Sequence, residues 1–154
     1  MSRRFILSVV FAALLVLVAV VPAAAGSAVV TKGEFATYSA GFDRGFDIDG
    51  HATMVRVPNG ETIVGTHVSG LAPNTAYGSH VHNKACDDAD GGGHYQQDPA
   101  GGVNPTNEMW VSFTTNAAGI GHGKTKNAFW ARPEAQSIVV HDTDGKRIAC
   151  ADLE

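Results

Sequence analysis

Short runs of alternating apolar and polar residues follow residue 26. They predict β-strands, because successive side chains of a strand point to opposite faces. The clearest alternation covers residues 52–57, 62–68 and 109–115, and a β-branched run covers residues 137–141. Shorter stretches of strand composition cover residues 28–31, 120–126 and 147–150, and a further strand is expected around residues 80–82.

Turn-forming residues separate these runs at near-regular intervals. Pro58-Asn59-Gly60 is a strong hairpin signal, and residues 116–119 and 142–145 have turn composition. The 18 glycines of the chain also oppose long helices. Short strands with regular turns therefore predict an all-β sandwich or barrel. Residues 35–50, rich in glycine and aspartate, have no clear assignment.

The longest stretch without periodicity covers residues 86–106. It contains four aspartates, three consecutive glycines, His94 and two prolines. Loops of this length inside a compact domain are usually either functional or disordered.

The N-terminus predicts export. Arg3 and Arg4 precede an apolar run over residues 5–21, and small residues follow up to Ala25. This order is typical of a secretory signal peptide, here residues 1–25, which leaves residues 26–154 as one domain. The protein is then secreted, periplasmic or held in the cell envelope. If the signal is retained, it would instead anchor the protein in a membrane, although the run is slightly short of the about 20 residues that span a bilayer.

The charge excludes some classes of partner. The net charge is −4, and removal of Arg3 and Arg4 with the signal changes it to −6 (−4 − 2). An acidic domain without a basic cluster is a poor ligand for nucleic acid or for an anionic membrane. The sequence also defines no surface for contact between subunits.

The two cysteines, Cys86 and Cys150, predict one disulfide, because an exported protein with an even number of cysteines usually pairs them. The bond would tie the loop after residue 82 to the last strand. The alternative is two free buried thiols.

Four histidines form a candidate metal site. His80 and His82 are two residues apart, so both imidazoles would leave the same face of one strand. His94 lies in the long loop, His141 ends an apolar strand, and the disulfide would bring these regions together. Four neutral imidazoles suit copper or zinc, and intrinsic affinity favours copper. For the pair alone, two surface histidines on an edge strand remain an alternative.

Three further histidines, His51, His67 and His122, are single residues on or beside predicted strands. For each of them we predict a surface or hydrogen-bonded role rather than metal ligation.

The ordered set of four histidines, two cysteines and one arginine resembles the copper/zinc superoxide dismutase family. The resemblance covers most of residues 26–154 and is carried by these motifs: Gly65-Thr66-His67-Val68-Ser69-Gly70-Leu71, Gly78-Ser79-His80-Val81-His82, Cys86, Gly93-His94, Asn116-Ala117-Ala118-Gly119, Val139-Val140-His141 and Arg147-Ile148-Ala149-Cys150. It implies a Greek-key, immunoglobulin-like β-barrel of about eight antiparallel strands.

The resemblance also implies roles for particular residues. His80, His82 and His141 match copper ligands, and His94 matches the histidine that bridges copper and zinc. His94 would in addition carry a proton during catalysis. Arg147 matches the arginine that attracts and orients superoxide. Cys86 and Cys150 match the family disulfide. The implied reaction converts superoxide into oxygen and hydrogen peroxide as copper alternates between Cu(II) and Cu(I).

Two departures from the family resemble its copper-only branch. No histidine lies between His94 and His122, and the place of the zinc-binding aspartate falls near Met109, so we expect no zinc. Only residues 142–146 separate His141 from the arginine that follows, where the family has a long charged loop.

Without zinc, the second ring nitrogen of His94 needs another partner. Glu108 is the candidate, with Asp98 behind it; the alternative is that Glu108 is a solvated residue at a strand end.

Two other functions remain open on the sequence. One is a non-catalytic, extracytoplasmic copper-binding protein on the same fold, and the other is a zinc-bound structural module. A hydrolase is not supported, because the chain has neither a nucleophile elbow nor a helical His-Glu-x-x-His pattern.

Overall fold

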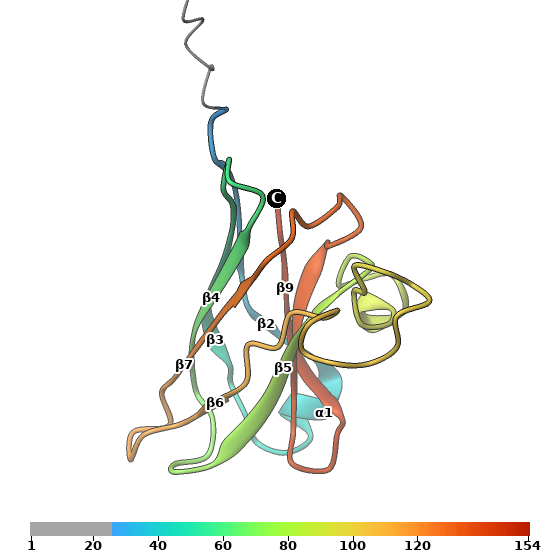
Figure 1. Cartoon of the computed structure of the whole chain (residues 1–154). Coiled ribbons are helices and arrows are strands. Elements are labelled where there is room, and N and C mark those ends of the chain that lie inside the picture. Colours follow the sequence, from blue (N-terminus) through green and yellow to red (C-terminus); the bar gives the residue numbers. More distant parts are fainter. Residues whose placement is uncertain (1–25) are drawn as a thin grey trace, which may run out of the picture.

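The computed structural model describes residues 26–154, and the predicted signal peptide over residues 1–25 lies outside the described residues. Two antiparallel sheets face each other with almost no helix (Figure 1). The predicted all-β sandwich is therefore confirmed. Within residues 26–154, no helix is long and apolar enough to span a membrane.

Each sheet contains strands from distant parts of the chain. The four-stranded sheet has the order β1 (Val29–Glu34), β3 (Asp49–Arg56), β4 (Thr62–Ser69) and β7 (Gly121–Asn127). The five-stranded sheet has the order β2 (Ala36–Thr37), β9 (Arg147–Asp152), β8 (Ser137–His141), β5 (Ala76–His82) and β6 (Phe113–Thr114). A short helix α1 (Ser39–Phe42) and a 3₁₀ turn η1 (Ala89–Gly91) complete the elements. The unassigned residues 35–50 hold β2, α1 and the start of β3.

The alternating run at residues 109–115 is a strand only at β6. Its side chains nevertheless alternate, because Met109 and Val111 are buried while Trp110 is 38% exposed. The segment follows the edge of β5 through two separate hydrogen bonds. The Val81 amide donates to the Met109 carbonyl at 3.0 Å, and the Val111 amide donates to the Ser79 carbonyl at 2.8 Å.

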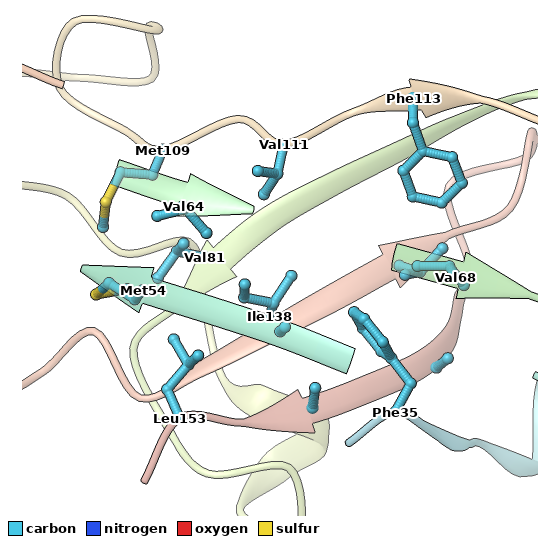
Figure 2. Close-up of a cluster of buried hydrophobic side chains, with 14 of the residues drawn as sticks. Phe35, Met54, Val64, Val68, Val81, Met109, Val111, Phe113, Ile138 and Leu153 are labelled. Carbon is cyan, nitrogen blue, oxygen red and sulfur yellow. The ribbon is translucent and has the colours of Figure 1, made fainter. Parts of the chain in front are cut away.

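The core lies between the two sheets and consists of their inward-facing side chains. Val81 and Ile138 from one sheet pack against Met54 and Val64 from the other (Figure 2). All four side chains are completely buried, and each contributes about 1.5–3 kcal/mol of hydrophobic stabilisation. Because Val81 faces the core, its two neighbours in β5 face outward.

The predicted disulfide joins Cys86, in the loop after β5, to Cys150 in β9. It excludes the alternative of two free thiols. The Cys86 peptide is held further by two side chains. Its amide donates to Asp152 Oδ1 at 2.7 Å, and its carbonyl accepts from the Tyr38 hydroxyl at 2.9 Å. The long loop is thus fastened to the sandwich beside its first turn.

Replacing both cysteines, as Cys86→Ser with Cys150→Ser, is expected to lower the free energy of unfolding by about 4 kcal/mol. The bond closes a loop of 64 positions, and the loss of chain entropy in the unfolded state gives this magnitude. Urea unfolding of the metal-free protein measures the change. A loss below about 1 kcal/mol would mean that the bond does not stabilise the fold by restricting the unfolded chain.

Candidate metal centre

Four imidazoles converge on the outer face of the five-stranded sheet. His80 and His82 come from β5, His141 from the end of β8, and His94 from the loop between β5 and β6. One ring nitrogen of each histidine lies within 4.8 Å of the corresponding nitrogens of the other three. The structure thus brings together all four histidines that the sequence selected.

Strand register explains three of the four positions. His80 and His82 leave the outer face of β5 because Val81, between them, is buried in the core. His141 in β8 is the cross-strand partner of Gly78 in β5. It therefore lies one diagonal step from His80. Diagonal neighbours on one face of a sheet lie about 7–8 Å apart, within reach of imidazole side chains.

The fourth histidine arrives because the long loop turns back along β5. His94 forms an isolated antiparallel bridge with His82, and the Asn83 amide donates to the Gly93 carbonyl at 2.9 Å. This approach requires glycine at Gly91, where φ is +87°. A Cβ atom there would lie 2.9 Å from Val139 Cγ2. Gly92 also has a positive φ, +70°, so these two glycines allow the close return.

The hydrogen bonds of His82 and His141 determine which of their ring nitrogens are free. His82 Nδ1 lies 3.3 Å from the Gly92 carbonyl, and His141 Nδ1 lies 3.1 Å from the Gly145 carbonyl. Carbonyl oxygens only accept, so each Nδ1 carries the proton and each Nε2 keeps its lone pair. The two Nε2 atoms face each other at 3.3 Å.

His80 offers a buried ring nitrogen that has no hydrogen-bond partner. His80 Nδ1 is inaccessible to solvent and makes no hydrogen bond. An unpartnered buried polar atom costs about 1–3 kcal/mol, and coordination of a metal ion would remove that cost. The residues present therefore fit a metal bound through His80 Nδ1 and through Nε2 of the other three histidines. An all-imidazole donor set suits copper or zinc.

Glu108 lies against His94, with its Oε2 2.9 Å from His94 Nδ1. The carboxylate is completely buried rather than solvated, and it accepts hydrogen bonds from Trp110 Nε1 at 2.7 Å and Gln96 Nε2 at 3.0 Å. Burial raises the pKa of Glu108, but the hydrogen bonds from Trp110, His94 and Gln96 outweigh it and hold the pKa below its usual value. The carboxylate thus stays ionised and leaves Nε2 of His94 free.

The surroundings of Glu108 differ from the sequence prediction in two ways. In the part of the chain that the structure describes, the side chain of Asp98 makes no hydrogen bond with His94 or Glu108, and its carboxylate instead accepts from the Ala100 amide at 2.9 Å. Sequence reasoning also missed Gln96 and Trp110 as partners of Glu108. Trp110 could have been found, since it is two residues from Glu108 in an alternating segment and so shares its face.

Three of the four imidazoles, those of His80, His82 and His141, are kept neutral by their surroundings. Burial, together with the neighbouring His94 and His141, lowers the pKa of His80 to about 4 and that of His82 to about 3. Burial also lowers the pKa of His141. Metal binding requires the neutral ring, so both β5 ligands are ready at neutral pH without losing a proton.

Arg147 is the cross-strand partner of His141 and lies beside the cluster. Its Nη1 donates to the carbonyls of Ala89 at 2.9 Å and Asp90 at 3.0 Å. Both of these residues have the unusual left-handed conformation, with φ of 52° and 54°. Among residues 26–154, no carboxylate forms an ion pair with Arg147, so its charge remains available to an anion.

Two other positive charges near the site, Lys84 and Arg44, are paired. Lys84 lies 3.0 Å from Asp88. Arg44, which the sequence analysis did not select, lies 2.6 Å from both Asp142 and Asp144 and so holds the short turn between His141 and the arginine. Arg44 also offsets two negative charges beside the cluster.

A two-sheet sandwich with a four-histidine cluster and a disulfide from the loop to the last strand fits the copper/zinc superoxide dismutase family. The fold is similar to that of superoxide dismutase 5 from Candida albicans with Cu(II), at 16% identity and a TM-score of 0.56. The match covers 80% of this chain and 90% of that chain. The chain therefore has a superoxide dismutase-like fold, as its sequence resemblance implied. No family model and no curated protein matches it.

The metal-free protein is expected to lose stability in acid. The pKa values of His80 and His82 in the folded state, about 4 and about 3, lie below the value of 6.5 for an unperturbed ring. The unfolded chain therefore binds more protons below pH 6.5, and the free energy of unfolding falls toward pH 4. Each ring contributes up to about 1.4 kcal/mol per pH unit.

Urea unfolding between pH 6.5 and pH 4 measures how the free energy of unfolding changes with pH. The comparison is with the double variant His80→Gln with His82→Gln. The variant lacks both titrating rings and should give a shallower slope. Equal slopes would show that the two rings are not shielded from protons in the folded state.

Glu108→Gln is expected to weaken copper binding about 10–100-fold, the usual effect of losing the partner of a metal-bound imidazole. Competition with a copper chelator measures the affinity. Asp98→Asn removes a nearby carboxylate that does not contact Glu108 and serves as the matched control. Equal affinity in the Glu108 variant and the wild type would contradict the role of this contact.

Proposed function

We propose that the protein is an exported, copper-dependent superoxide dismutase that works without zinc. The observation that carries this proposal is the convergence of four imidazole nitrogens beside the guanidinium of Arg147. The similarity to a Cu(II) superoxide dismutase supports it. Copper, when bound, supplies a centre that alternates between Cu(II) and Cu(I), so that two superoxide ions and two protons become oxygen and hydrogen peroxide.

Arg147 binds and orients the superoxide anion in this proposal. Its charge lies close enough to His82 and His141 to help lower the pKa of both rings. The domain is acidic overall, so attraction of an anion depends on local positive potential. Lys146 adds to that potential, whereas Lys84 is paired with Asp88.

His94 is the proton carrier. Its Nδ1 is held by Glu108 at 2.9 Å, so Nε2 is the atom that can accept and release a proton within the cluster. The buried carboxylate keeps the ring in one orientation during that exchange.

The contact with Glu108 also supports the expectation that zinc is not required. In the family that the sequence resembles, the second nitrogen of this histidine bridges to zinc. Here a carboxylate with three hydrogen-bond donors occupies that nitrogen. Glu108 thus supplies the orientation and negative charge that the ring needs.

Export is supported by the disulfide, which persists in oxidising compartments, and by the predicted signal over residues 1–25. Superoxide in the cell envelope or outside the cell would then be the substrate.

The direct test is the decay of superoxide by protein that carries one equivalent of copper and no zinc. We expect decay far faster than with free copper at equal concentration, and loss of that rate in His82→Ala. Stoichiometric copper binding with no decay above the free-copper control would assign the protein to the non-catalytic copper-binding class.

Arg147→Ala is expected to slow turnover at least about tenfold at low ionic strength while copper affinity changes little, because steering acts on the approach of the anion. Arg147→Lys retains the charge and should keep part of the rate. Superoxide decay at two salt concentrations separates the variants. A larger effect on copper affinity than on turnover would reassign Arg147 to a structural role.

A further inference from the structure

Three histidines that the metal centre does not use form a row on the four-stranded sheet. His51 in β3 is the direct cross-strand partner of His67 in β4, and His67 is the direct partner of His122 in β7. All three point to the outer face, where His51 and His122 are exposed and His67 is half-buried. Glu34 in β1 is the partner of His51 and extends the row across the whole sheet.

The rings in this row are in close contact. His67 Nδ1 lies 3.2 Å from His122 Nδ1, with ring centroids 4.6 Å apart. The rings of His51 and His67 stack with centroids 5.4 Å apart. The row therefore brings three imidazoles and a carboxylate side by side through register alone.

The sequence alone predicted only a surface or hydrogen-bonded role for these histidines. From their geometry we infer a second metal site, which binds a divalent transition metal ion such as Zn²⁺ or Cu²⁺ between His67 and His122. A zinc–nitrogen bond is about 2.0–2.1 Å long, so two tetrahedral ligands lie about 3.3–3.4 Å apart. The observed 3.2 Å between the two Nδ1 atoms matches that separation. The ion takes the place of the single proton that the two nitrogens otherwise share.

The surface beside the pair leaves room for the ion and its remaining ligands. The three rings border an open hollow of about 350 Å³ that also includes Gly65 and Lys124. Gly65 lies between Thr53 and Lys124 in the adjacent row, where the absence of a side chain keeps the hollow open. A rotated His51 ring can provide a third ligand, and Glu34 can hold the second nitrogen of that ring, as carboxylates do at metal sites.

This site is independent of the proposed dismutase centre. The row lies on the outer face of the four-stranded sheet, whereas the four-histidine cluster lies on the outer face of the other sheet. Figure 1 shows β3, β4 and β7 on the side of the molecule away from the loop that carries His94. With the hydrophobic core between them, either site can be removed without disturbing the ligands of the other.

The test is calorimetric titration of Zn²⁺ into protein that already carries one equivalent of copper. We expect one further Zn²⁺ per chain, with binding lost in His67→Gln and in His122→Gln. Lys124→Gln changes the same strand and the same hollow without removing a ligand, and it should retain binding. Superoxide decay should be equal in wild type and His67→Gln, which separates this site from the catalytic proposal.

A crystal soaked in Zn²⁺ provides the second measurement. Anomalous scattering at the zinc edge should place the ion within bonding distance of both His67 and His122. The inference is overturned if the copper-loaded protein binds no Zn²⁺, or if His67→Gln binds it as tightly as the wild type. Either result would leave the pair as a hydrogen bond between two rings.

Discussion

The two-residue period of β5 is the constraint on which the rest of the structure depends. Val81 is completely buried, and this fixes His80 and His82 on the opposite face. A slip of one residue would expose Val81 and drive both imidazoles into an apolar core, so hydrophobic packing specifies the register strongly. The interaction that stabilises the fold thus also positions two of the proposed metal ligands.

The buried carboxylate of Glu108 is the second organising element. A buried charge is tolerated only when it is well paired, and three donors satisfy this one. The carboxylate also fixes the orientation of the His94 ring, which would otherwise be set only by a loop without regular structure. A carboxylate beside an all-imidazole cluster also offsets part of the charge that a bound cation would bring, so one contact serves both geometry and electrostatics.

Much of the fold could be predicted from sequence because alternation marks the buried faces of β3 and β4. The resemblance to a known family then identified the four histidines as one site. Three features could not. The burial of Glu108 depends on a segment that pairs with the edge of β5 without forming a regular strand. The role of Arg44 depends on a contact across 100 positions. The row of His51, His67 and His122 depends on β7 pairing with β4, a register that no local pattern reveals.

In the proposed centre, four imidazoles bind one copper through His80 Nδ1 and through Nε2 of His82, His94 and His141. A crystal structure of the copper-loaded protein, with anomalous scattering at the copper edge, tests it most directly. We expect one copper at these four nitrogens, with Glu108 still bound to Nδ1 of His94. A copper ligated by fewer of these rings, or ligated by Nδ1 of His94 with Glu108 displaced, would contradict it.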